Sequence, residues 1–415
     1  MNASDPRPEI DEELKSTESV PKNKNIFDNW INAYRSFMLK NVNRIVWPES
    51  TLQQAMYLFP GKFKDVEVAS EGIYTLLNIV GIYHNTILTG AAASRSNYQP
   101  SMHTRYTHHY TQHNRRYKRI AYLLAVLQKS ELLMEILSRR YGGEKGQKTS
   151  VLTIESAKSV LRLILFYVTK MRMVPSSVVP GRDFEPSMFE DEDENLNETP
   201  TGADTVDVDR YWTMPRTGRR LPLPKQHQLP SREDEVAEFL IKRVLHPDDV
   251  APGPRLMHKL TRDGQANEVM YLLRPLIYTL LTYIVMRRNS NNRTKNKGGR
   301  EQLLQWMPWI IGILMDWTYQ NSVLTSLSEE FGGMRNARSK LTGLEKEELQ
   351  KRKDDLWWWA LRGKFYDSIT KPIIDKVVKK TENVPLLNLV GLYFSDYQYM
   401  LENYHFASEY LVFPC

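Results

Sequence analysis

Two groups of residues have types and spacings that could support chemistry. His258 and Asp263 are separated by four residues, a spacing at which a carboxylate can orient a histidine that acts as a general base in acyl transfer. His108, His109 and His113 could face one side of a helix, where imidazole nitrogens can bind a metal such as zinc. Each site needs further residues from elsewhere in the sequence.

Neither group has these companions. Membrane glycerolipid acyltransferases carry a phosphate-binding Phe-Pro-Glu-Gly-like motif after their His-x4-Asp pair, whereas the similar string at 58–61 precedes the pair and lacks the glutamate. The histidine-rich stretch 103–119 has no nearby carboxylate or cysteine, so a surface that attracts anionic lipid is the better hypothesis. The sequence also has no glycine-rich phosphate loop. We expect neither an enzyme nor a cofactor, with a membrane acyltransferase that uses His258 and Asp263 as the alternative.

The elements that must position any site are helices, because the sequence has almost no two-residue alternation. The stretch 175–230 has eight prolines and 11 acidic against six basic residues, a composition that buries too little apolar surface to fold. We therefore predict an all-α protein with a disordered arm at 1–25 and two helical halves, 26–174 and 231–415. A disordered acidic, proline-rich linker at 175–230 joins the halves.

Four apolar windows compete as membrane helices, although the mean hydropathy of the chain is only −0.50. They are 72–94, 151–174, 269–286 and 303–324, and the number of spans stays open. Within the second window, polar residues recur at helical spacing, which predicts a helix that lies in an interface or lines a bundle. These residues are Glu155, Lys158, Ser159 and Arg162.

The loop between the last two windows is strongly basic, in a chain whose net charge is +7. Residues 287–300 include six basic, no acidic and no aromatic residues, so contact with anionic lipid is favoured over binding of nucleic acid. If the flanking windows form a hairpin, the loop should face the cytosol. A solvated loop is the alternative, and the candidate lipid contacts are Arg287, Arg288, Arg293, Lys295 and Lys297.

Arg274 and Pro275 interrupt one of the apolar windows. A charge in an apolar run needs a partner, and we expect an ion pair with Glu268, about one and a half turns earlier. Proline removes a backbone donor and can bend a helix there. Contact with a partner protein is the alternative role for Arg274 and Pro275.

A capping box at Thr342 and Glu345 should start a charged helix near the C-terminal end. Three adjacent tryptophans follow it, and on a helix they point in different directions, so at least one should lie at an interface with lipid or protein. The candidate contacts in this region are Trp357, Trp358, Trp359, Phe365, Tyr366 and Asp367.

Several strings together resemble the family of the sixteenth peroxin, a peroxisomal membrane protein family. They are Gly-Lys-Phe-Lys-Asp at 61–65, Ser-Glu-x-x-Tyr-x-x-x-Asn at 70–78, Glu-x-x-Tyr-x-x-Arg-Pro-Leu at 268–276, and the run at 341–367 that ends in Leu-Arg-x-x-Phe-Tyr-Asp. A tyrosine-rich end, 393–410, follows in family order. The long acidic linker, the histidine-rich stretch and Lys364, where a proline is common, depart from the family pattern.

This resemblance implies a role in peroxisome biogenesis without catalysis. Family members act at the peroxisomal membrane, which some reach through the endoplasmic reticulum. They help to recruit the docking peroxin, and so receive new membrane proteins carried by the farnesylated import receptor. The family usually has both termini in the cytosol. A lipid-binding membrane tether is the alternative that shares the surface features of this sequence.

Overall fold

In the computed structural model, residues 26–42, 66–94, 98–184, 251–291, 299–331, 341–381 and 398–408 are described, with short pieces at 44–45, 48, 51–52, 211–213, 220–222 and 248. The described residues are almost entirely helical, which confirms the all-α prediction. The strands among them are β1 (Tyr211–Thr213) and β2 (Arg220–Pro222), which form a short antiparallel ribbon.

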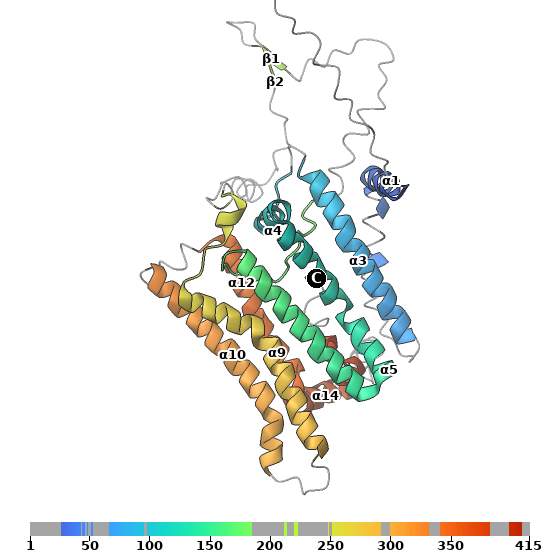
Figure 1. Ribbon diagram of the computed structural model, residues 1–415, viewed down its shortest axis with the longest axis vertical. Helices are drawn as coiled ribbons and strands as arrows, with labels where there is room; N and C mark the ends of the chain where they lie inside the picture. Colours follow the sequence, from blue (N-terminus) through green and yellow to red (C-terminus); the bar gives the residue numbers. More distant parts are fainter. Residues whose placement is uncertain are drawn as a thin grey trace, which may run out of the picture.

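Four long helices make an elongated bundle (Figure 1). They are α3 (Val66–Ala92), α5 (Arg115–Val168), α9 (Arg262–Asn291) and α10 (Gly299–Phe331). Helix α5 bends back on itself at Gly143, whose φ of 60° is a conformation that glycine adopts without strain. Its two arms lie side by side, with α3 against one flank and the α9–α10 hairpin against the other.

Shorter helices pack around the long ones. Ser101 caps α4, Asn114 caps α5, and both hydrogen bonds of the predicted capping box at Thr342 and Glu345 are present. The short elements are α1 (Ile26–Lys40), α4 (Met102–His113), η3 (Gly253–Leu256), α12 (Gly343–Asp354), η4 (Asp355–Leu361), α13 (Gly363–Phe365), η5 (Tyr366–Thr370) and α14 (Lys371–Thr381).

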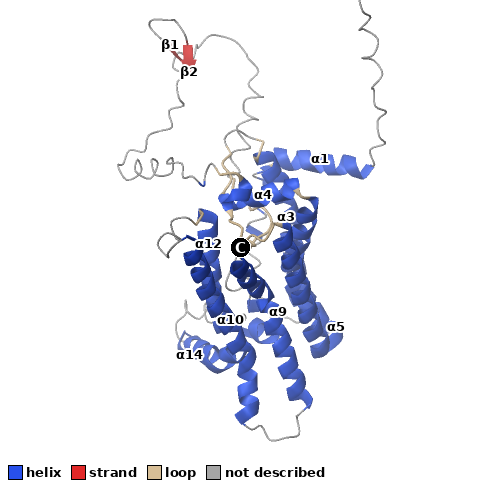
Figure 2. Cartoon of the chain, turned by 60° about the vertical axis from the view of Figure 1, so that its left-hand side comes forward, coloured by secondary structure: helices blue, strands red, loops and turns tan. Residues whose placement is uncertain are grey.

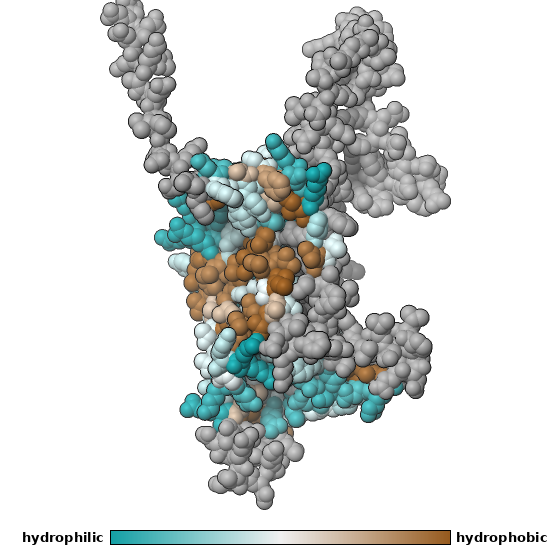
Figure 3. Space-filling view, turned by 90° about the vertical axis from the view of Figure 1, so that its right-hand side faces the viewer, coloured by the Kyte–Doolittle hydropathy of each residue, from teal (hydrophilic) through white to brown (hydrophobic). Residues whose placement is uncertain are grey.

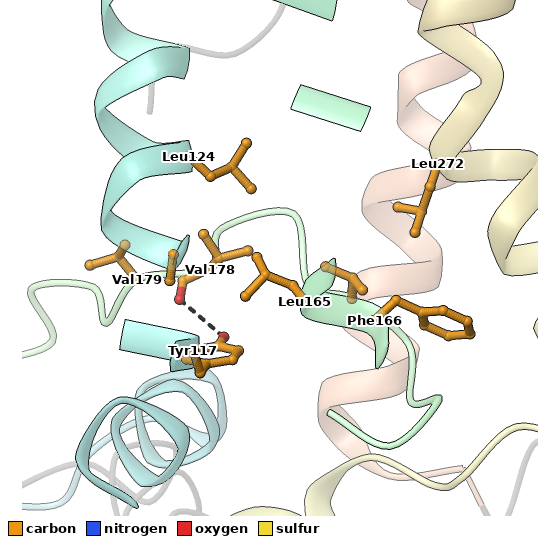
Figure 4. Packing of buried hydrophobic residues seen from close by; sticks show 9 residues of the cluster. Tyr117, Leu124, Leu165, Phe166, Val178, Val179 and Leu272 are labelled. Carbon is orange, nitrogen blue, oxygen red and sulfur yellow. Dashed lines mark hydrogen bonds between the residues drawn. The ribbon is translucent and has the colours of Figure 1, made fainter. Parts of the chain in front are cut away.

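The main apolar cluster corrects the predicted start of the linker. Val178 and Val179 are buried between the arms of α5, and the Tyr117 hydroxyl donates a hydrogen bond of 3.1 Å to the Val178 carbonyl (Figure 4). Phe184 is buried in a second cluster with α1 and α3. Residues 175–184 are thus part of the fold, because their valines and Phe184 offset the prolines around them. Most of the remaining predicted linker, like the arm at 1–25, lies outside the described residues.

The two predicted halves share one interior. Leu272 of α9 packs in the same cluster as Leu124, Leu165 and Phe166 of α5 (Figure 4). The C-terminal segment 398–408 packs against α5 as well, with Phe406 fully buried. The halves therefore form one body.

Candidate membrane and partner interface

The interior of the bundle holds charged side chains. Arg352 of α12 makes a bidentate pair with Glu268 of α9, with N–O distances of 2.7 and 2.9 Å, and both side chains are almost fully buried. The Arg352 guanidinium also donates to the Tyr319 hydroxyl of α10 and lies over the Tyr271 ring. Bidentate geometry of this kind is the strong form of the arginine–carboxylate interaction.

The same network binds the segment that follows α5, at Val174 and Ser176. The backbone N–H of Val174 donates to Glu268 at 3.0 Å, and the Val174 carbonyl accepts from Arg352 at 2.8 Å. Next to it, the Ser176 N–H donates to Glu348 of α12 at 2.8 Å. The network thus connects α9, α10 and α12 to the N-terminal part of the chain.

Arg274 has a different partner from the one predicted. Its Nη1 lies 2.5 Å from Asp316 Oδ1 of α10, whereas Glu268 is used by Arg352, so the predicted Arg274–Glu268 pair is wrong. Asp316 also accepts a hydrogen bond from the Trp359 indole. The α9 helix runs through Pro275 without interruption. Arg274 and Asp316 therefore hold the hairpin together from inside.

A second group of buried charges lies between the arms of α5. Lys158 Nζ lies 2.7 Å from Glu131 and 3.0 Å from Glu155, and all three side chains are buried. Ser159 is buried beside them and donates to the Leu272 carbonyl of α9 at 3.4 Å. The predicted polar stripe therefore lines the bundle, as expected from its spacing.

A third carboxylate holds the C-terminal segment. Glu135, which is fully buried on α5, accepts hydrogen bonds from the backbone N–H groups of His405 at 2.7 Å and Phe406 at 2.9 Å. Arg139, one turn along α5, donates to the carbonyl and the side chain of Asn403. Segment 398–408 is thus fixed by charge-assisted hydrogen bonds.

The three adjacent tryptophans separate as the sequence predicted. They lie on the 3₁₀ helix η4, where Trp357 is 77% exposed while Trp358 and Trp359 are 8% and 2% exposed. The Trp358 indole donates to the Ser408 carbonyl at 3.0 Å. Trp359 fills the space over Gly312. Of the three, Trp357 is the side chain that can contact lipid or a partner.

Nearby candidates also divide between interior and surface. Phe365 stacks on Trp309 of α10 with ring centroids 4.8 Å apart, and Tyr366 is buried. Asp367 is exposed, with its carboxylate 3.9 Å from Lys364. Phe365 and Tyr366 therefore position this segment on the hairpin, and Asp367 is the one of the three that solvent reaches freely.

The outer surface also exposes rows of apolar side chains. On α10, exposed apolar residues follow one line of the helix at alternating spacings of four and three. They are Leu303, Met307, Ile310, Leu314 and Trp317. On the opposite flank, hydrophobic side chains form a band between hydrophilic ends (Figure 3), to which Ile73, Leu76 and Tyr83 of α3 contribute.

The basic last turns of α9 lie at one end of the bundle. Arg287 and Arg288 are exposed in the last turns of α9, at the end opposite α4 (Figure 2). Arg293, Lys295 and Lys297 lie outside the described residues. The predicted lipid contact of this loop stays a prediction.

The structure does not assemble the acyl-transfer pair. Both oxygens of Glu345 lie 3.0–3.1 Å from His258 Nδ1, and Glu345 also completes the capping box of α12. Asp263 is exposed in the first turn of α9. His258 therefore pairs with a helix-capping carboxylate, which does not support the alternative in which Asp263 orients His258.

The histidines of α4 do not converge on a common point where a metal ion could bind. His109 stacks on His113 with ring centroids 4.3 Å apart, and His113 contacts the His109 carbonyl. Burial, together with the neighbouring His113, lowers the pKa of His109. Among the described residues, no group of three histidine, cysteine, aspartate or glutamate side chains is placed to hold a metal ion.

Asp316 is the contact residue that the sequence interpretation missed. It is the one charge in its apolar window at 303–324, just as Arg274 is the one charge in 269–286. Opposite charges in two neighbouring apolar helices should pair, because each is costly without the other. That signal could have identified the Arg274–Asp316 pair.

One helix segment among the described residues, Arg262–Arg288, is long and apolar enough to cross a bilayer. Only 22% of its most apolar window is buried, whereas a core helix of a soluble protein is mostly buried. At about 1.5 Å per residue, these 27 residues span about 40 Å, more than the ~30 Å of a hydrocarbon core.

A helical bundle with charges inside and apolar ridges outside defines a class of proteins whose surface is made for lipid or for protein partners. Residues 32–403 match the model of the family described as Peroxisomal membrane protein (Pex16). The chain belongs to this family, which comprises peroxisome biogenesis proteins of the peroxisomal membrane and not enzymes.

Two relatives extend over nearly the same length. The peroxisomal membrane protein PEX16 of Schizosaccharomyces pombe is 22% identical over 374 residues, covering 88% of this chain and 94% of the relative. Peroxisome biogenesis protein 16 of Arabidopsis thaliana is 23% identical over 381 residues, covering 86% and 94%. No solved structure matches the chain.

Proposed function

We propose that this protein recruits the docking peroxin to the peroxisomal membrane, and to the endoplasmic reticulum on the way, and so supports insertion of peroxisomal membrane proteins. The farnesylated import receptor would deliver these proteins to the docking peroxin. The proposal combines family membership with one observation, that the bundle pairs charged side chains in its interior and exposes rows of apolar side chains on its outer helices. Such a distribution suits helices whose outer faces contact acyl chains.

The apolar ridge of α10 and the band on α3 would contact lipid on opposite flanks of the bundle. The basic residues Arg287 and Arg288 would then lie near headgroups at one end, where anionic lipid attracts them. Trp357 is the candidate contact with the docking peroxin, because it is the most exposed of three adjacent tryptophans and the other two are buried.

The test replaces Trp357 alone in cells that lack the native chain. We expect Trp357→Ala to lower the amount of docking peroxin on peroxisomes several-fold, while the variant itself stays in the membrane pellet after alkaline carbonate extraction. Trp357→Phe, which keeps an aromatic ring, is the matched control and should retain most recruitment. Full recruitment by Trp357→Ala would exclude this contact, and release of the unaltered chain by carbonate would exclude the membrane-embedded bundle.

A further inference from the structure

Helix α1 carries three exposed aromatic residues. Trp30 is 74% exposed and Phe37 is 55% exposed, and Tyr34 lies between them in sequence. At about 100° per residue, positions 30, 34 and 37 fall within about 60° of one another on the helix. They form an aromatic face on one side of the helix. The opposite side carries the polar Asn32 and the charged Arg35.

Only one edge of the apolar side of α1 is covered. Met38 is fully buried in a cluster with Leu88 and Ala92, near the end of α3. Tyr34, one turn earlier on α1, contacts His84 through its hydroxyl at 2.7 Å. The rest of the aromatic face is left open beside these contacts.

These contacts fix the direction in which the aromatic face points. Met38 packs at positions 88 and 92 of α3, whereas Tyr34 stacks on Tyr83 with ring centroids 6.4 Å apart, one to two turns closer to the middle of α3. The aromatic face therefore turns toward the middle of α3, where the apolar band lies (Figure 3). The polar side of α1, with Arg35, turns the other way.

The orientation of the α1 axis indicates how the aromatic face could meet a membrane. Helix α1 lies across the bundle, near the end that carries α4 and far from the tip of the α9–α10 hairpin (Figure 2). If the bundle stands in a bilayer with its long helices along the normal, α1 lies parallel to the membrane plane. Tryptophan and tyrosine prefer the level of the headgroups, and amphipathic helices lie there with their apolar face down.

We propose that α1 is an in-plane anchor that inserts Trp30, Tyr34 and Phe37 at the boundary between headgroups and acyl chains of a phospholipid bilayer. It anchors the side of the membrane opposite Arg287 and Arg288 at the end of α9. The inference rests on the membrane placement in the proposed function. Its ligand is the lipid boundary itself, because the aromatic face is continuous with the exposed Tyr83 of the α3 band.

The test measures depth in the membrane with the full chain in vesicles of phosphatidylcholine and phosphatidylserine. The single native cysteine is first removed by Cys415→Ser. Nitroxide labels are then attached to the separate variants Trp30→Cys and Phe37→Cys, to Asn32→Cys as the polar-face control, and to Leu314→Cys as a reference on the α10 ridge. Collision rates with oxygen and with a water-soluble nickel complex give the depth of each label.

We expect labels at 30 and 37 to show a several-fold higher oxygen-to-nickel ratio than the label at 32, at a shallower depth than 314. Ratios at 30 and 37 equal to that at 32, with 314 still in acyl chains, would overturn the anchor alone and favour a protein partner for this face. A label at 314 that is fully accessible to nickel would instead overturn the membrane placement. Each variant is checked by its thermal unfolding midpoint against Cys415→Ser.

Discussion

Arg352→Met should be among the most destabilising single changes in the chain. Arg352 is 3% exposed, and it satisfies both oxygens of Glu268 and the Val174 carbonyl. Its removal leaves Glu268 buried without a counter-charge, and breaking a buried pair in this way costs about 3–5 kcal/mol. The desolvated carboxylate accounts for most of this cost, because a methionine fills much of the vacated volume.

The assay is equilibrium unfolding of the purified chain in detergent micelles, followed by tryptophan fluorescence. The double variant Arg352→Met, Glu268→Gln should recover about 2 kcal/mol or more, since a neutral glutamine can still accept from the Val174 N–H. Lys353→Met is the matched control, exposed on the same helix. An Arg352→Met variant within about 0.5 kcal/mol of the parent, the range of surface substitutions, would refute the reasoning.

Three other changes test separate parts of the structure. Gly312→Ala would place a Cβ 1.9 Å from the Trp359 ring, and we expect a loss of about 1–3 kcal/mol or more, seen as a lower thermal midpoint. Glu135→Ala removes the acceptor of the C-terminal segment, so limited proteolysis within 398–408 should become several-fold faster. Arg287→Glu with Arg288→Glu should lower the phosphatidylserine retained by the purified protein, since each basic residue near an anionic surface contributes about 1 kcal/mol.

The controls for the first two changes are residues of the same type in helices, Gly90 for Gly312 and Glu144 for Glu135. Gly90→Ala should be neutral or slightly stabilising, because nothing lies within 4 Å of its added Cβ. Glu144→Ala, at an exposed glutamate of α5, should leave proteolysis of the C-terminal segment unchanged. Equal lipid retention by the parent and the double arginine variant would show that the hairpin tip does not bind anionic lipid.

Local features of the fold could be predicted from the sequence because their causes are local. The capping box needs only Thr342 and Glu345, and the polar stripe around Lys158 needs only helical periodicity. The separation of Trp357 from its neighbours follows from the fixed rotation between successive residues of a helix. Each of these depends on residues a few positions apart.

Long-range pairings could not be predicted in the same way. Arg352 lies 84 positions after Glu268, and several carboxylates in between could have served it equally well by charge. Nearness in sequence favoured Glu268 for Arg274, but Asp316 on the neighbouring helix has the better position. The start of the linker was misplaced because the burial of Val178 and Val179 depends on the space between the arms of α5, which composition does not reveal.

The contact between Glu135 and the C-terminal segment has a consequence for the synthesis of the chain. Glu135 leaves the ribosome 270 residues before His405, which at about 5–20 residues per second is a delay of about 14–54 s. Throughout this time the carboxylate lacks the backbone amides that satisfy it in the finished protein. Until segment 398–408 has been made, water or another polar group must take the place of these amides. This part of the bundle therefore closes only after residues 405 and 406 have left the ribosome.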